Sequence, residues 1–144
     1  MKVSVEITPG CEKPFAVIYT DRITEEIQYI LDMFQSSDSP VTAMSNENII
    51  ILQPKEIYLI RVENGGSVIY GQKESFYSRK RLYELKDQLG NRFMQISKSA
   101  IINLSYMDSI EAGFSGTMLL KMKNGTKEYV SRKYLPEFKK YLGL

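Results

Sequence analysis

The sequence predicts a mainly β fold of the α+β class, with antiparallel sheets and short helices. Three observations favour this class. Short runs of β-branched and aromatic residues recur along most of the 144 residues, turns with glycine or proline separate these runs, and only short stretches show the helical spacing of apolar residues. The composition, 43% hydrophobic and 25% charged, is that of an ordinary globular protein. We therefore expect one compact domain with a short extra segment.

Residues 1–40 are predicted to form this extra segment, with the order strand, strand, helix. Apolar and polar residues alternate over residues 3–7, which indicates a first strand, and residues 15–19 form a second β-branched and aromatic run. The pair Pro9-Gly10 predicts a turn between them. We expect the segment to supply packing or dimer contacts.

A helix is predicted to end this segment, from about residue 25 to residue 35. Thr24 is a candidate N-cap, and the acidic pair Glu25-Glu26 is favourable in a first turn. The apolar residues that share one helical face are Ile27, Ile30, Leu31 and Phe34. The polar residues 36–40 end in proline and predict a linker, so the domain boundary is expected there.

Residues 41–144 are predicted to form the main domain from consecutive antiparallel strands. The strands are expected over residues 49–52, 57–62, 67–70, 75–78, 93–96, 100–104, 118–123 and 126–131. Helical spacing indicates two short helices, one with Leu82, Leu85 and Leu89 and one with Leu135, Phe138 and Leu142. A glycine follows each helix, as is common at helix C-termini. Glu63 to Gly66 indicate a tight turn.

The clearest local prediction is a hairpin around Asn124-Gly125. This dipeptide best supplies the two positive φ angles of a two-residue type I′ turn. Such a turn would place Lys121 opposite Glu128 and Leu120 opposite Tyr129, which are two sensible cross-strand pairs.

Several kinds of chemistry have no support in the sequence. The chain has no histidine and a single cysteine, Cys11, so it lacks the ligands of a Cys/His zinc site and the commonest general base. No glycine-rich phosphate-binding motif is present. We therefore expect no enzyme activity, cofactor, metal or small-molecule substrate. Cys11 is expected to be an ordinary thiol, and the absence of a secretory signal and of long apolar runs predicts a cytoplasmic location.

The net charge of +2 hides an asymmetry between the two halves of the chain. Residues 1–78 hold six Lys/Arg against 11 Asp/Glu, a net charge of −5. Residues 79–144 hold 13 Lys/Arg against six Asp/Glu, a net charge of +7. The second half is therefore the one expected to attract a polyanion.

Basic residues of the second half gather in three places. These are Arg79-Lys80-Arg81, Lys98 between two serines, and Arg132-Lys133 with Lys139-Lys140. Two of the places lie where strands end, and a loop at such a position can present long cationic side chains to phosphates and base edges. Because soluble proteins carry solvated lysines and arginines everywhere, the charge pattern leaves a plain solvated surface open as the alternative.

A series of ordered motifs runs through the same half. Residues 92–104 read RFMQISKSAIINL, and the motif continues through residues 107–110. Residues 81–85 precede it, and Lys123-Asn124-Gly125 and residues 129–134 follow it. In this order and spacing, the motifs resemble LytTR-type DNA-binding domains over roughly residues 45–144. The chain is similar to stand-alone bacterial members, in which a short segment replaces the phosphoacceptor receiver domain, so control by phosphorylation is not expected.

The resemblance implies an elongated arrangement of small antiparallel sheets. It also implies that loop side chains, rather than a recognition helix, enter successive major grooves, in contrast to most DNA-binding motifs. The loop residues at positions where relatives place DNA contacts are Asn64, Gly65, Gly66, Ser67, Ser97, Lys98, Ser99, Arg132 and Lys133. Arg79, Lys80 and Arg81 flank a helix start, and phosphate contacts and solvated surface are equal alternatives for them.

The first two loops depart from the pattern of some relatives. Those relatives have histidine in the first loop and asparagine in the second, where this chain has glycines and Lys98. We therefore expect a different sequence preference. Lys98 and Lys133 can each reach guanine O6/N7 or a phosphate, whereas Arg132 could instead pair with a carboxylate.

Other residues of the motifs have plainer interpretations. Those expected in the core are Ile96, Ile101, Ile102, Leu104 and Ile110. Asn103 is expected to stabilise a turn through its backbone neighbours. Tyr70, Tyr77 and Tyr83 are expected to pack half-buried rather than to stack on single-stranded bases.

The sequence thus predicts a transcription regulator that binds duplex DNA specifically, with two copies on a repeated site. The resemblance also implies a small membrane protein that holds the regulator inactive. The alternative is a protein-interaction module whose acidic N-terminal half binds a basic or membrane-tethered partner. RNA binding is less favoured, because the usual aromatic RNP-type motif is missing.

Overall fold

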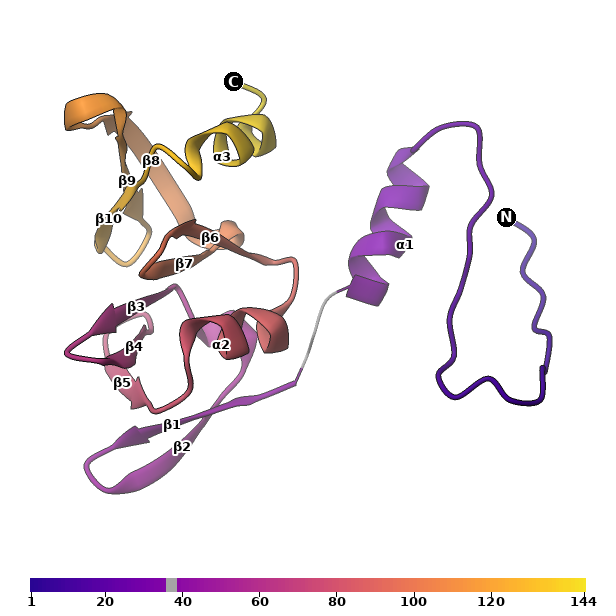
Figure 1. The fold of residues 1–144 in the computed structure, drawn as a ribbon, viewed down its shortest axis with the longest axis horizontal. Coiled ribbons are helices and arrows are strands. Elements are labelled where there is room, and N and C mark those ends of the chain that lie inside the picture. The colour runs from indigo at the N-terminus through magenta and orange to yellow at the C-terminus, as the bar shows by residue number, and fades with distance from the viewer. Residues whose placement is uncertain (36–38) are drawn as a thin grey trace.

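The structure is a computed structural model that describes residues 1–35 and 39–144. The predicted linker at residues 36–40 therefore lies partly outside the described residues. Figure 1 shows a β-rich body, with α1 (Glu25–Gln35) and the preceding extended chain beside it.

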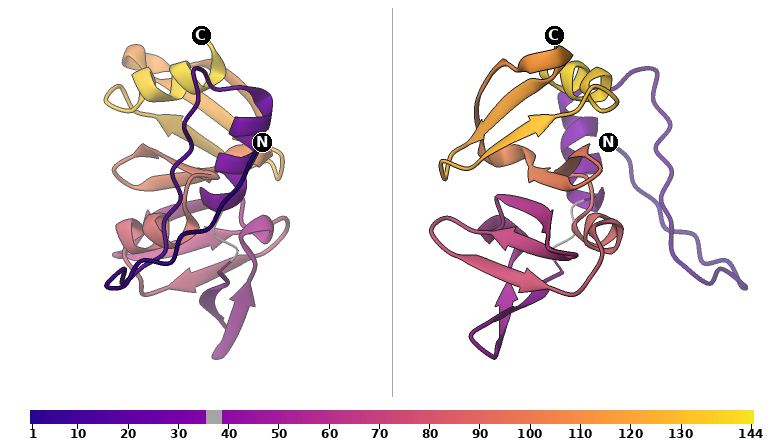
Figure 2. Two further views of the ribbon diagram at one scale, coloured as in Figure 1. Left: turned by 90° about the vertical axis from the view of Figure 1, so that its right-hand side faces the viewer. Right: turned by 60° about the vertical axis from the view of Figure 1, so that its left-hand side comes forward.

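Two antiparallel sheets form the body, which confirms the predicted fold class. The larger sheet has the strand order β2-β1-β5-β4-β3-β7-β6, and the smaller has the order β10-β9-β8. The strands of the larger sheet are β1 (Val41–Ser45), β2 (Asn48–Leu52), β3 (Leu59–Glu63), β4 (Gly66–Tyr70), β5 (Ser75–Ser78), β6 (Phe93–Ser97) and β7 (Ala100–Asn103). Those of the smaller sheet are β8 (Met107–Ala112), β9 (Met118–Met122) and β10 (Lys127–Val130). In Figures 1 and 2 the smaller sheet lies end to end with the larger one, so the body is elongated.

Three helices and three single 3-10 turns complete the chain as described. Thr24 caps α1 as predicted, since its Oγ1 accepts a hydrogen bond from the Ile27 amide at 3.3 Å. Helix α2 (Leu82–Leu89) ends at Gly90 and α3 (Leu135–Leu142) ends at Gly143, and both glycines have positive φ angles, 71° and 74°. The 3-10 turns are Pro54–Glu56, Leu104–Tyr106 and Phe114–Gly116.

The central strands β3 and β7 separate two hydrophobic clusters. In β7, Ile101 belongs to one cluster and Ile102 to the other, and in β3 Ile60 and Leu59 divide in the same way. Successive residues of a strand point to opposite faces, so both faces of these two strands are buried. Helix α2 covers the first cluster, and α3 with the smaller sheet covers the second. Of the predicted core residues, Ile96, Ile101 and Ile102 are fully buried, and Leu104 and Ile110 pack partly buried against the second cluster.

The two strands predicted in the N-terminal segment are wrong for this structure. Residues 3–7 and 15–19 are extended but pair with no strand, and their large apolar side chains are exposed except for that of Ile18, which is partly buried. The predicted turn is present, with Gly10 at φ +87°. The alternation is real, but a strand also needs a partner for its hydrogen bonds, and a lone hairpin of this size is only marginally stable in water.

The register predicted for the Asn124-Gly125 hairpin is also wrong. Lys121 lies opposite Lys127 and Leu120 opposite Glu128, one residue away from the prediction. Only Gly125 of the dipeptide has a positive φ angle, and the Met122 amide pairs with the carbonyl of Thr126 across a three-residue loop. This is the loop in which one left-handed glycine closes a type I turn, rather than the two-residue type I′ loop.

Strands β1 and β8 were not predicted from the sequence. In β1 the alternation is short, and its turn to β2 has no glycine or proline, although Asn46 and Glu47 both adopt positive φ angles. In β8 a bulge between Met107 and Ser109 breaks the alternation. None of the described helices combines the length and apolar character that a membrane span requires.

Candidate nucleic-acid interface

Two of the predicted loops and the basic segment before α2 meet around one open hollow. We call this the basic hollow, and its volume is about 480 Å³. Its lining residues are Val62, Gly65, Gly66, Ser67, Arg79, Lys80, Arg81, Leu82, Tyr83, Gln95 and Lys98. It therefore brings together residues that are up to 36 positions apart in the chain.

The first loop is the tight turn between β3 and β4. Asn64 and Gly65 have φ angles of 51° and 77°, and Glu63 pairs with Gly66, so the turn has the two positive φ angles of a type I′ hairpin. Asn64 and Gly65 are exposed at its tip. Gly66 is buried, and a Cβ atom there would collide with the ring of Tyr77. Asn64 can thus reach a ligand, whereas Gly66 allows close packing.

Ser67 has a structural position rather than an accessible one. It is 2% exposed, and its hydroxyl donates a hydrogen bond to the carbonyl of Lys80 at 2.8 Å. The amide of Lys80 in turn donates to the hydroxyl of Ser78, which is also buried, at 3.2 Å. Two buried serines from β4 and β5 therefore hold the backbone of the basic segment.

The cations of this segment are exposed. Within the described residues, Arg79 and Arg81 form no ion pair, since the ion pairs there are those of Arg61. The ammonium of Lys80 donates to the side-chain oxygen of Gln88 in α2 at 3.0 Å. Arg79 and Arg81 are thus available to an anionic ligand, and Lys80 is partly engaged.

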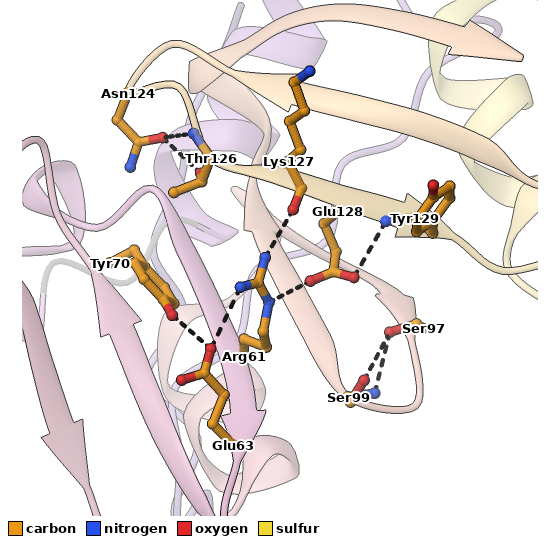
Figure 3. Close-up of polar contacts among 10 residues, drawn as sticks. All are labelled: Arg61, Glu63, Tyr70, Ser97, Ser99, Asn124, Thr126, Lys127, Glu128 and Tyr129. Carbon is orange, nitrogen blue, oxygen red and sulfur yellow. Dashed lines mark hydrogen bonds and ion pairs between the residues drawn. The ribbon is translucent and has the colours of Figure 1, made fainter. Parts of the chain in front are cut away.

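Lys98 lies at the exposed tip of the hairpin between β6 and β7. Ser97 and Ser99 flank it and face each other, with their hydroxyl oxygens 3.4 Å apart (Figure 3). The amide of Ser99 also donates to the hydroxyl of Ser97 at 3.2 Å. The carbonyl of Ser99 accepts from the amide of Val62 at 2.8 Å, which fixes this loop beside the end of β3 and hence beside the first loop.

The third predicted loop, Arg132-Lys133, does not line the basic hollow. The amide of the preceding Ser131 donates to the carbonyl of Ile96 at 2.9 Å, so the loop starts beside β6. Arg132 lies beside Gly116 in the turn between β8 and β9, and the ammonium of Lys133 lies 5.7 Å from the ring centroid of Tyr134. Both cations are exposed. Arg132 and Lys133 therefore form a second exposed basic group, separate from the hollow.

Two uncharged polar residues, Gln95 and Tyr83, line the hollow although they were not among the predicted site residues. Gln95 donates from its side-chain nitrogen to the carbonyl of Ser97 at 2.9 Å and supports the Lys98 loop. Tyr83 was expected to be half-buried, but it is 63% exposed. Tyr77, at 43% exposed, also departs from that expectation. The first turn of α2 directs Tyr83 away from the buried face of Leu82 and Leu85, which helical spacing could have indicated.

Asn103 occupies the structural position predicted for it. It is buried, and its side chain donates to the carbonyl of Ile57 at 2.9 Å and accepts from the amide of Ser105 at 3.0 Å. It is therefore not part of the candidate interface.

Comparison with known proteins defines the class. Residues 47–143 match the LytTr DNA-binding domain family, and the chain belongs to this family. A solved LytTr DNA-binding domain of a methyl-accepting/DNA response regulator from Bacillus cereus has the same fold, with a TM-score of 0.68 and 23% identity. That match covers 74% of this chain and 98% of the other.

Full-length relatives occur in Staphylococcus aureus. Proteins of strains NCTC 8325 and MSSA476, both named uncharacterized HTH-type transcriptional regulators, are each 25% identical over 146 residues. Each match covers 100% of this chain and 99% of the relative. The described helices of this chain do not form a helix-turn-helix, because β1 to β5 separate α1 from α2 and β6 to β10 separate α2 from α3.

Proposed function

We propose that this chain is a transcription regulator that binds duplex DNA through the basic hollow and its flanking loops. The observation that carries the proposal is the convergence of Gly65-Gly66 of the β3–β4 turn, residues 79–81 and Lys98 around one hollow of a LytTr fold. The names of the Staphylococcus aureus relatives also support a role in transcription.

The role of each residue in binding DNA follows from its exposure and from how its backbone is held. Arg79 and Arg81 are exposed cations on a braced backbone, a suitable arrangement for phosphate contacts that position the protein. Lys98 projects from a tight hairpin, and such a tip fits a major groove about 12 Å wide. There its ammonium would donate to guanine O6/N7. Asn64, at the neighbouring tip, would bind adenine through its amide.

Arg132 and Lys133 supply a second contact point. Because they lie on the part of the elongated body that bears the smaller sheet, we assign them to phosphates further along the duplex. Ser67, Gly66, Ser97 and Ser99 then act mainly by holding the loops in shape, since their side chains or backbones are engaged within the protein.

Two steps test this function. Bound duplexes are first selected from a pool of random sequences, and the affinity of the protein for the selected site is then measured by fluorescence anisotropy. Lys98→Ala should weaken binding to the selected site by about 1–3 kcal/mol, a factor of about five to 150, and relax the preference at one base pair. Arg79→Ala should weaken all duplexes similarly and reduce the slope of log affinity against log salt by about one. Lys73→Ala is the matched control, because Lys73 is exposed and lines a separate hollow.

Two results would contradict the proposal. One is an affinity that does not depend on salt, and the other is an unchanged affinity in both Lys98→Ala and Arg79→Ala. If no duplex binds at low salt, the interaction module becomes the better assignment. The membrane-protein inhibitor and the cytoplasmic location stay predictions.

A further inference from the structure

Within residues 1–35 and 39–144, one edge of the larger sheet has no other segment hydrogen-bonded to it. Of its two edge strands, β6 lies against the smaller sheet through the Ser131 to Ile96 hydrogen bond, but β2 has a pairing partner on one side only, β1. Edge strands usually carry charges, prolines or bulges that prevent pairing with another chain. The β2 sequence NIIIL has none of these, and Ile49 and Ile51 are 73% and 65% exposed.

The same chain contains an extended segment that does not pair with any strand of either sheet. We call residues 1–23 the arm. Its two apolar stretches, residues 3–7, which alternate with polar residues, and residues 15–19, which are all apolar, each match the five-residue length of β2. Six of their large apolar side chains are between 59% and 93% exposed, namely Val3, Val5, Ile7, Phe15, Val17 and Tyr19, while Ile18 is partly buried.

The arm is shared with full-length relatives. The Bacillus cereus domain covers only 74% of this chain, whereas the Staphylococcus aureus regulators align over all of it. Unpaired apolar stretches that accompany an unprotected sheet edge suggest that the two features meet in the functional protein. A paired strand would satisfy the free backbone groups of both.

We propose that the arm of one copy adds as a β-strand to the β2 edge of a second copy, and that two such exchanges form a dimer. Figure 1 shows the arm leaving the end of α1 that is further from β1 and then running back along the side of α1 that faces away from the body, so α1 lies between the arm and the β2 edge of its own chain. The right-hand view of Figure 2 shows the same separation. A second copy is therefore the better-placed partner.

Charge and area are consistent with this partner. Residues 1–40 hold three basic and seven acidic residues, a net charge of −4, while residues 41–144 hold 16 and 10, a net charge of +6, so the two parts attract each other. The six apolar side chains of one arm offer on the order of 600 Å². Two exchanged arms thus reach about 1,200 Å², the lower limit for specific interfaces.

Sedimentation of the full chain without DNA tests the proposal, independently of the proposed function. The wild-type protein should be a dimer. Val5→Asp with Val17→Asp in the arm should give a monomer, and so should Ile51→Lys at the edge. Thr42→Lys is the matched control, because Thr42 is exposed on β1 opposite Ile51 but is not on the edge, and this variant should remain a dimer.

Mixing the arm variant with the edge variant gives the decisive result. The edge variant supplies an intact arm and the arm variant supplies an intact edge, so part of the mixture should form a dimer. Neither variant should form a dimer alone. A monomeric wild-type protein would overturn the proposal and indicate docking within one chain or none. A dimeric arm variant would overturn it in favour of direct β2 to β2 pairing, and a mixture that stays monomeric would overturn it as well. Circular dichroism confirms that each variant is folded.

Discussion

Arg61 of β3 and Glu128 of β10 join the two sheets through an ion pair of 2.5 Å between Nε and Oε2 (Figure 3). The guanidinium also donates to the carbonyl of Lys127 at 2.8 Å and lies 3.4 Å from Glu63. Burial lowers the pKa of Arg61, but its hydrogen bond to Glu128 and the charge of that carboxylate outweigh this and raise the pKa above its ordinary value. The pair therefore ties the sheet that bears the hollow to the smaller sheet.

Breaking this pair should destabilise the fold. Both side chains are mostly buried, so Glu128→Gln should lower the free energy of unfolding by about 1–2 kcal/mol, and Arg61→Met by about 2–3 kcal/mol. Urea unfolding of both single variants and the double variant measures the coupling, expected at about 1–3 kcal/mol. Additive effects would show that the ion pair does not link the sheets energetically.

Ser67→Ala should separate a bracing role from direct DNA contact. Loss of the hydrogen bond to the Lys80 carbonyl should cost about 1–2 kcal/mol of stability and weaken DNA binding only a few-fold. Ser75→Ala, an exposed serine on β5, should change neither quantity. A large loss of affinity with unchanged stability would instead mean that the Ser67 hydroxyl touches DNA.

Asn124 should stabilise the fold through the hydrogen bond that its side-chain amide donates. Its side chain donates to the Gly71 carbonyl at 2.8 Å across the two sheets, while its oxygen accepts from the Thr126 amide within the loop. Asn124→Asp keeps the acceptor but loses the donor, and we expect it to cost about 1–2 kcal/mol in thermal unfolding, as much as Asn124→Ala. A near-neutral Asn124→Asp would show that the bond to Gly71 is dispensable.

Stability should fall at high pH because of Tyr70. Burial and the hydrogen bond to Glu63, at 2.6 Å, raise the pKa of Tyr70 above its ordinary value of 10.0. A raised pKa in the folded state gives stability that is fully present below pH 10.0 and is lost as the pH rises through the folded value.

Urea midpoints measured from neutral pH to about pH 11 check this expectation, with Tyr70→Phe as the control that lacks the titrating hydroxyl. The difference in stability between wild type and Tyr70→Phe should shrink as the pH rises. A difference that stays constant would mean that the phenol does not titrate with a raised pKa.

The LytTr family, most strands of the two sheets and the helix ends were predictable because each depends on nearby residues. Glycines at 90 and 143 end helices through their own φ angles, and Asn64-Gly65 forms its turn from two adjacent residues. The Asn124-Gly125 register was not predictable in this way, because two loop lengths suit the same dipeptide and the bond to Gly71 favours one of them.

The residues of the candidate site also divide into those that the local sequence could predict and those that depend on tertiary structure. Lys98, Arg79 and Asn64 were identifiable as exposed cations and turn residues from local pattern alone. The role of Ser67, the separation of Arg132 from the hollow and the lack of pairing in the arm were decided by tertiary structure. Each of these depends on which strands lie side by side, as the Arg61–Glu128 pair does over 67 positions, and side-chain periodicity within a strand carries no information on its neighbours in the sheet.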